Sequence, residues 1–333
     1  MNATPTANMD EAAVEPHQPH WISRAAFPVL ALLFAISQVT LAFAVYRGNY
    51  WLAVPLVLVS SHLMHGILIG FHEASHGLLR KSRLLNEIDG ILIGTFSLIS
   101  FSLYRAAHQL HHAYLASERD EELWPFVHPE MPRWKRVAAA VLELTMGLLF
   151  TPFLFARTFL RKGSPIRNRR LRRRIWMEVA LAAVVWTTLL TTVAVFDCWK
   201  YFLWLHLLPA WLAANMQSLR KYVEHVGLTG STVNGSTRSI VAEGWVANFV
   251  TFTLLHEPYH GIHHWRSGLP HPELPQHTAA LAPTTPDERP PFRTYRAALH
   301  DLFVNLPDPR VGAQWRGITR ATRQELAQQS VNS

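Results

Sequence analysis

The 333-residue sequence has little cysteine and little charge. Its single cysteine, Cys198, cannot form an internal disulfide or a cysteine-ligated metal site. Charged residues make up 16% of the chain and hydrophobic residues 49%, a balance that favours a membrane protein. The sequence has no glycine-rich phosphate-binding loop. Together these absences exclude a disulfide scaffold, a zinc ribbon and a P-loop nucleotide enzyme.

Histidine, by contrast, is abundant, and eight of the 19 histidines fall in three clusters. The clusters read His-x-x-x-His at 72–76 and His-x-x-His-His at 108–112 and 260–264. On a helix, residues three or four apart share a face, so the rings of one cluster can reach one ion. Imidazole is the commonest metal ligand and suits iron, zinc and copper. With His225 and His256, the clusters offer up to ten ligands, enough for two six-coordinate ions.

Acidic residues near the clusters are candidate partners for the outward-facing ring nitrogens of these histidines. Glu73 lies inside the first cluster, Glu224 precedes His225, and Asp89 lies between the first two clusters. The alternative is that each is an ordinary charge at the end of a helix.

Long hydrophobic runs divide the rest of the chain. Residues 25–46, 51–71 and 175–196 are each long enough to cross the hydrocarbon core of a bilayer, which needs about 20 residues. Residues 201–216 return from the third run as a fourth crossing. Residues 90–103 are too short to span comfortably and are expected to form a re-entrant or buried helix.

The orientation follows from a basic loop over residues 157–174, which has nine Lys or Arg and no acidic residue. The positive-inside rule places this loop in the cytoplasm. A crossing at 137–156 would put the second histidine cluster on the opposite side, so we expect an interfacial or re-entrant helix there. The prediction is an all-α integral membrane protein with about four transmembrane helices, re-entrant or interfacial helices and a histidine-rich cytoplasmic cap.

The two ends of the chain differ from its middle. Residues 1–22 are polar, lack the basic start of a signal peptide and are expected to form a disordered tail. Residues 23–270 form the membrane domain, and residues 271–333 a soluble cytoplasmic cap. The net charge of +8 is concentrated in the basic loop, which favours contact with lipid headgroups or an acidic electron-transfer partner and not with nucleic acid.

Two other kinds of metalloprotein share part of this pattern. His72-Glu73-Ala-Ser-His76 matches the H-E-x-x-H signature of zinc proteases, in which the glutamate is the general base. An intramembrane zinc metalloprotease would leave the other two clusters without a role. A metal transporter or sensor would explain many ligands in a membrane, but not the repeated His-x-x-His-His pattern.

The order of the three clusters resembles that of the membrane fatty acid desaturases and their hydroxylase and ketolase relatives. The resemblance covers roughly residues 72–270 and extends to Gly77, to residues 219–225 and to Tyr259. It implies a catalytic domain with two non-haem iron ions, O2 as co-substrate and a separate electron donor of the ferredoxin or rubredoxin type. The iron ligands carried over from the family would be His72, His76, His108, His111, His112, His225, His260, His263 and His264. His256 stands where relatives often have asparagine, so it is a tenth ligand, a partner of a ligand or a substrate contact.

This resemblance implies a membrane desaturase that introduces a double bond into a fatty acyl chain or a related aliphatic substrate. Hydroxylation or ketone formation begins with the same hydrogen abstraction and stays open as an alternative. Desaturation of a small metabolite such as dihydrorhizobitoxine is a further alternative. The compact length is compatible with a bacterial inner membrane.

Overall fold

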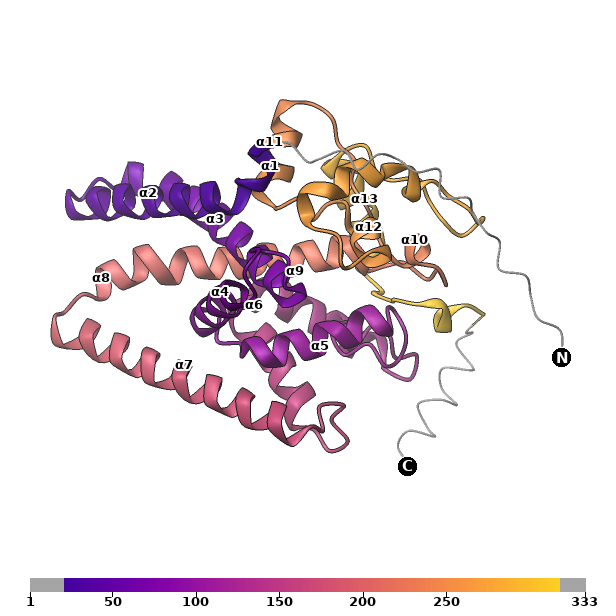
Figure 1. Cartoon of the computed structure of the whole chain (residues 1–333), viewed down its shortest axis with the longest axis horizontal. Coiled ribbons are helices and arrows are strands. Elements are labelled where there is room, and N and C mark those ends of the chain that lie inside the picture. Colours follow the sequence, from indigo (N-terminus) through magenta and orange to yellow (C-terminus); the bar gives the residue numbers. More distant parts are fainter. Residues whose placement is uncertain (1–20, 318–333) are drawn as a thin grey trace.

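The computed structural model describes residues 21–317, and their regular structure is helical (Figure 1). In these residues the only β-pairing is an isolated bridge between Ile240 and Phe292. Most of the tail expected over residues 1–22, and the end of the cap after residue 317, lie outside the described residues. The long helices are α2 (Ala26–Tyr46), α3 (Tyr50–His76), α6 (Arg133–Leu160), α7 (Arg169–Val195) and α9 (Leu208–His225).

The shorter helices lie at the ends of these long ones and in the loops between them. They are α1 (Trp21–Arg24), α4 (Arg83–Phe96), α5 (Phe101–Ala113), α8 (Trp199–Phe202), α10 (Val233–Ser236), α11 (Trp245–Thr253), α12 (His260–Trp265) and α13 (Tyr295–Asn305). A π-helix, η1 (Leu203–Leu207), joins α8 to α9, and two 3₁₀ helices, η2 (His271–Leu281) and η3 (Ala313–Trp315), lie in the C-terminal segment.

Four helices of the described chain are long and apolar enough to cross a membrane: α2, α3, α6 and α7. Their number agrees with the prediction, and α2, α3 and α7 correspond to three of the runs expected to cross. Residues 137–156, expected to be interfacial, lie within α6, whose 28 residues reach spanning length despite a kink at Met146. Residues 201–216, expected to cross, lie in α8, η1 and α9, which follow one another without a break from Trp199 to His225. Taken alone, α9 is not among the four because its C-terminal end is polar.

Residues 90–103, expected to form a re-entrant or buried helix, contain a sharp bend. Helices α4 and α5 are inclined by 102° across residues 97–100. Glu178 of α7 holds this bend, because it accepts hydrogen bonds from the Ser100 hydroxyl (2.6 Å), the Ser102 hydroxyl (2.6 Å) and the Ser102 backbone N–H (2.9 Å). The bend turns α5 so that the second histidine cluster lies beside the first.

Large apolar side chains cover the outer faces of the long helices. Val39 and Phe43 of α2 are 72% and 63% exposed, and Val184 of α7 is 64% exposed. An apolar surface of this extent is unfavourable in water and is typical of helices that face lipid. The protein is therefore an integral membrane protein.

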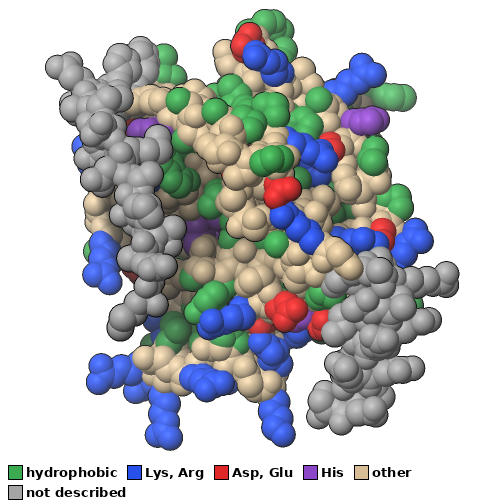
Figure 2. Space-filling view, turned by 90° about the vertical axis from the view of Figure 1, so that its right-hand side faces the viewer, with side chains coloured by type: hydrophobic (Ala, Val, Ile, Leu, Met, Phe, Trp, Pro, Cys, Tyr) green, Lys and Arg blue, Asp and Glu red, His purple; other side chains and the backbone are tan. Residues whose placement is uncertain are grey.

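The opposite end of the molecule is polar. In Figure 1, α2, α7 and α8 extend to the left, whereas α10, α12 and α13 lie at the right. Figure 2 looks at that right-hand end, where Lys and Arg side chains gather. The C-terminal segment is attached there, since Trp315 Nε1 donates to the Phe126 carbonyl (2.7 Å) and Leu302 packs in a core with Tyr222.

Candidate metal centre

The first histidine cluster lies at the end of α3, where the chain stops being helical. Gly77 adopts a left-handed conformation (φ +77°) directly after His76 and ends the helix. Glycine favours this conformation because it has no Cβ. The last turn of α3 therefore presents His72 and His76 toward α5 and α12.

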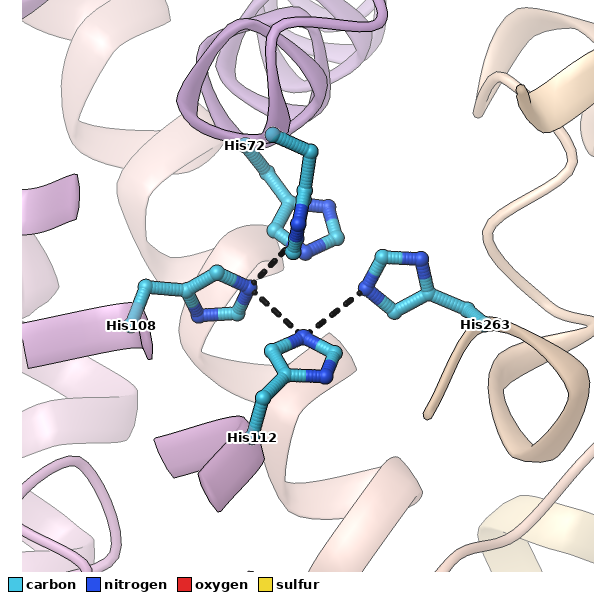
Figure 3. A group of neighbouring side chains, drawn as sticks. His72, His108, His112 and His263 are labelled. Atoms are coloured by element: carbon cyan, nitrogen blue, oxygen red, sulfur yellow. Dashed lines mark hydrogen bonds between the residues drawn. The ribbon is translucent and has the colours of Figure 1, made fainter. Parts of the chain in front are cut away.

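One group of converging ring nitrogens combines all three clusters. It contains five histidines, and one ring nitrogen of each lies within 4.8 Å of a ring nitrogen of every other. The Nε2 atoms of His76 and His108 are 3.0 Å apart, those of His108 and His112 are 3.1 Å apart, and those of His112 and His263 are 3.1 Å apart. Figure 3 shows four of these rings turned toward a common centre. We call this the first group: His72, His76, His108, His112 and His263.

A second group lies beside it and draws on α5, α9 and α12. Ring nitrogens of His111, His225 and His264 lie within 4.8 Å of one another, as do ligand atoms of Glu224, His225 and His260. The Nε2 atoms of His225 and His260 are 2.9 Å apart, and those of His260 and His264 are 3.0 Å apart. We call this the second group: His111, His225, His260 and His264. All nine histidines proposed as ligands thus fall in two neighbouring groups.

These distances fit metal ions of high coordination number. Two nitrogens bound at about 2.1 Å to one ion and at a right angle to each other lie about 3.0 Å apart. Both ring nitrogens of buried His72 lack a hydrogen-bond partner, and a cation at the centre of the first group would supply one for Nε2. Nine imidazoles exceed the four ligands of a tetrahedral zinc site and suit two ions such as iron.

The histidines of the third cluster are in the form that binds metal. Burial lowers the pKa of His260 to about 4 and the pKa values of His263 and His264 well below the usual value. These imidazoles are therefore neutral near pH 7 and have a lone pair free for a cation.

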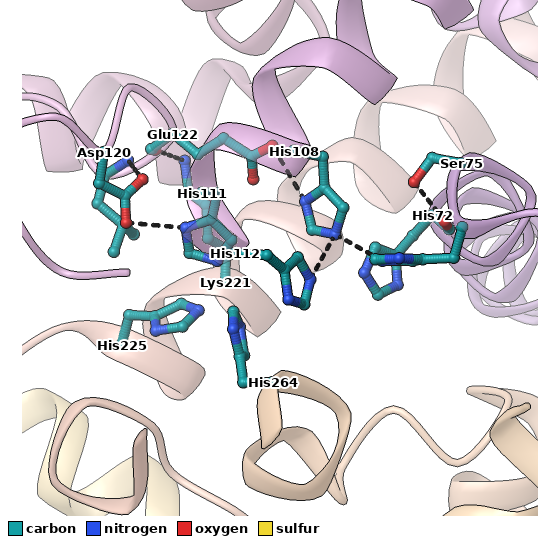
Figure 4. Close-up of polar contacts among 12 residues, drawn as sticks. His72, Ser75, His108, His111, His112, Asp120, Glu122, Lys221, His225 and His264 are labelled. Atoms are coloured by element: carbon teal, nitrogen blue, oxygen red, sulfur yellow. Dashed lines mark hydrogen bonds and ion pairs between the residues drawn. The ribbon is translucent and has the colours of Figure 1, made fainter. Parts of the chain in front are cut away.

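Four of the outward-facing Nδ1 atoms have partners of their own, and Figure 4 shows those of His108 and His111. His108 Nδ1 lies 3.1 Å from Glu122, and His111 Nδ1 lies 2.8 Å from Asp120. His225 Nδ1 donates to the Ser236 carbonyl (3.1 Å), and His260 Nδ1 lies 3.0 Å from Glu257. A hydrogen bond at Nδ1 fixes the ring and leaves Nε2 for the metal.

Sequence reasoning missed Asp120, Glu122 and Glu257. A signal for the first two was present, since the acidic run 118–122 directly follows the second cluster. For Glu257 the signal was its position three residues before His260.

The four additional candidates occupy different places. Glu73 Oε1 is 3.8 Å from His72 Nδ1, and Glu224 Oε1 is 3.6 Å from His260 Nδ1, so both lie at the site without a short contact to these rings. Asp89 is not at the site, because it pairs with Arg80 (2.6 Å).

His256 is not among the atoms that converge in either group. Its Nδ1 lies 3.1 Å from Nδ1 of His271, and the two rings stack. The structure therefore places this histidine beside the cap and away from the nine converging rings.

An apolar cavity of about 490 Å³ lies among α2, α3, α4, α6 and α9. Its wall includes Phe34, Met64, Leu68 and Ala214. Four further wall residues also line a small pocket against the histidines: Tyr104, Thr151, Phe155 and Gln217. The cavity therefore ends next to the converging rings. Together, fold and site define an integral membrane protein with a histidine-rich candidate metal centre beside an apolar cavity.

Comparisons with known proteins agree with this class. The family model described as "Fatty acid desaturase" matches residues 49–296. An omega-3 fatty acid desaturase, chloroplastic, of Brassica napus is 23% identical over 308 residues, covering 84% of this chain and 74% of the relative. An sn-2 acyl-lipid omega-3 desaturase (ferredoxin), chloroplastic, of Arabidopsis thaliana is also 23% identical, and the match covers 84% of this chain and 67% of the relative. The chain belongs to the fatty acid desaturase family, as its histidine clusters predicted.

Proposed function

We propose that the protein is an O2-dependent desaturase that introduces a double bond into a fatty acyl chain or a related aliphatic substrate. Membership of the family implies an oxidoreductase in a membrane, with a lipid substrate. The observation that carries the finer proposal is the apolar cavity of about 490 Å³ that ends at the two histidine groups.

In this proposal the nine histidines hold two iron ions, one in each group. When bound, the irons supply with O2 and external electrons the oxidising power needed to break an unactivated C–H bond. The carboxylates and the Ser236 carbonyl keep the rings in place at Nδ1. Because these contacts already fix the rings, little conformational freedom is lost when a metal ion binds.

The cavity selects and positions the substrate. Its mostly aliphatic and aromatic wall excludes water and favours a hydrocarbon chain. Tyr104 stands between cavity and site, since its ring stacks on His108 with centroids 5.4 Å apart. A chain lying along this wall presents one part of its length to the centre, and this placement decides which carbon reacts.

The surroundings of the site are also part of the proposal. We place the site and both termini in the cytoplasm of a bacterial inner membrane, on the strength of the basic loop at 157–174. In this orientation α6 lies along the membrane surface and does not cross. Ion pairs support this, because Arg136 near the start of α6 pairs with Asp308 of the cap and Arg157 near its end pairs with Glu121, next to Glu122 of the site. Electrons come from a separate ferredoxin- or rubredoxin-type protein, and the Arabidopsis relative has ferredoxin in its name. Residues 1–22 are a tail, 23–270 the catalytic domain and 271–333 a cap. Protease accessibility of the basic loop from the outside would contradict this orientation.

The first test is the metal content of protein purified in mild detergent. We expect about two iron ions per chain and little zinc. Reduced protein supplied with O2 and acyl lipids should then yield an alkene, identified by mass spectrometry as a loss of two hydrogens. An alcohol or a ketone would assign the hydroxylase or ketolase chemistry of the same family. About one zinc and no iron would refute the proposal.

A further inference from the structure

Glu257 lies between the two histidine groups, in the short segment that joins α11 to α12. Its side chain is 1% exposed. One carboxylate oxygen, Oε1, is 3.0 Å from His260 Nδ1, and the other, Oε2, is 3.3 Å from His72 Nδ1. Of the acidic side chains in residues 21–317, Glu257 alone contacts a histidine of each group at these distances.

The carboxylate is also anchored by a partly buried arginine. Arg220 Nη1 of α9 donates to Glu257 Oε1 (2.5 Å) and to both oxygens of Glu224 (2.7 and 2.9 Å). The arginine offsets the cost of burying two carboxylates side by side. Glu257 therefore joins α3, which carries His72, to α9 and α12.

The backbone before Glu257 adopts a conformation that side chains disfavour. Leu255 and His256 both have left-handed φ values, 48° and 58°. Two such residues in succession are costly unless surrounding contacts hold them, and such strain gathers at functional sites. Here the His256 N–H donates to the Thr251 carbonyl (2.8 Å) and the Glu257 N–H to the Leu254 carbonyl (3.0 Å). The strained turn aims the Glu257 side chain inward.

Glu122 and Asp120 provide a contrast within the same site. Both lie in the loop after α5, and each contacts one histidine of its own group, His108 and His111 respectively. They hold one ring each, whereas Glu257 holds a ring of each group.

We propose that Glu257 is the positioning residue that couples the two metal sites. It accepts a hydrogen bond from Nδ1 of His260 and faces Nδ1 of His72 at 3.3 Å, so that each ring presents Nε2 to its own group. A metal ion in one group then holds Glu257 in the position that the other group needs. The inference rests on the proposed function only in assuming that both groups bind metal.

The test is a titration of the metal-free protein in detergent with Co2+, whose absorption spectrum reports its ligands. Glutamine at position 257 keeps the shape but has one acceptor oxygen, and its amide N–H faces an N–H of a histidine. Loss of such a partner typically lowers metal affinity by roughly 10- to 100-fold. We expect two Co2+ sites in the wild type and a loss of this size at both sites in Glu257→Gln.

The matched controls are Glu122→Gln and Asp120→Asn, each of which should weaken one of the two sites and leave the other unchanged. The inference is overturned if Glu257→Gln weakens a single site, as the controls do, or leaves both unchanged. A wild-type protein with only one Co2+ site would also overturn it.

Thermal unfolding of the metal-free variants separates positioning from folding. If Glu257→Gln unfolds earlier than the wild type, Glu257→Asp is measured, because aspartate keeps the charge beside Arg220 but is one methylene shorter. We expect aspartate to restore the unfolding temperature but not both affinities, and full recovery of both would overturn the inference. Cobalt binding does not depend on turnover. A protein that binds two Co2+ yet desaturates no acyl substrate would refute the proposed function and leave this inference standing.

Discussion

Each histidine group brings Nε2 atoms together at its centre, but the two groups are built from different helices. The first takes histidines from α3, α5 and α12, and the second from α5, α9 and α12. The second and third clusters are therefore each divided between the groups. Neighbours in sequence such as His263 and His264 belong to different groups, because consecutive residues on a helix point about 100° apart. The difference teaches that one His-x-x-His-His cluster can contribute to two separate groups of converging nitrogens.

The groups also meet each other. The rings of His112, from the first group, and His264, from the second, stack with centroids 4.3 Å apart. This contact places the two groups side by side. Changing a residue of one group and measuring metal binding in the other therefore tests how far the two groups depend on each other.

The largest effect is expected from removing one of these two stacked ligands. His112→Ala and His264→Ala should each abolish turnover, because each leaves one centre without a ligand. The protein should still insert in the membrane, because insertion depends on the long apolar helices and not on these two rings. Product formation and iron content check this, and we expect the iron of the altered group to be lost first. The ligand assignment is wrong if both variants keep turnover.

Glu73→Gln distinguishes the desaturase from the zinc protease. Glu73 is buried beside His72 but 3.8 Å from its ring nitrogen, so the oxygenase should keep measurable turnover. A protease would lose its general base and nearly all of its rate. Turnover of an acyl substrate and hydrolysis of a membrane peptide are measured in parallel. Loss of all activity together with bound zinc would favour the protease.

Filling the cavity should change the substrate and leave both groups intact. Ala214 of α9 lines the cavity, and Ala214→Trp should reduce the length of acyl chain that is accepted, with unchanged iron content. Overpacking of this kind costs about 1–3 kcal/mol of stability. Val184→Trp, on the outer face of α7, is the matched control and should leave the product profile unchanged. The substrate lies elsewhere if the two variants behave alike.

The smallest effect is expected at Asp89, whose partner Arg80 is itself partly exposed. An exposed ion pair contributes about 0–1 kcal/mol, so Asp89→Asn should change neither metal affinity nor turnover measurably. The Co2+ titration described for Glu257 provides the measurement. A loss as large as that of Glu122→Gln would show that Asp89 acts on the centre after all.

Much of the fold could be predicted from local patterns. The apolar runs at 25–46, 51–71 and 175–196 became α2, α3 and α7, because a run of about 20 apolar residues is stable in lipid only as a helix. Which of the remaining helices cross stays a prediction for α6 and for residues 201–216. There the length of the helix depends on polar residues at its ends and on a π-helical segment, which hydropathy does not report.

The sequence by itself determined the nine histidines, the spacing within each cluster and the glycine that ends α3 after His76. These are local properties, because the geometry of a helix sets which side chains share a face. Only the tertiary structure decided how the histidines divide into two groups, that Asp89 and His256 stand apart, and that Glu257 joins the groups. Contacts such as that between His112 and His263, 151 residues apart, depend on how distant helices pack, and no spacing along the chain contains that information.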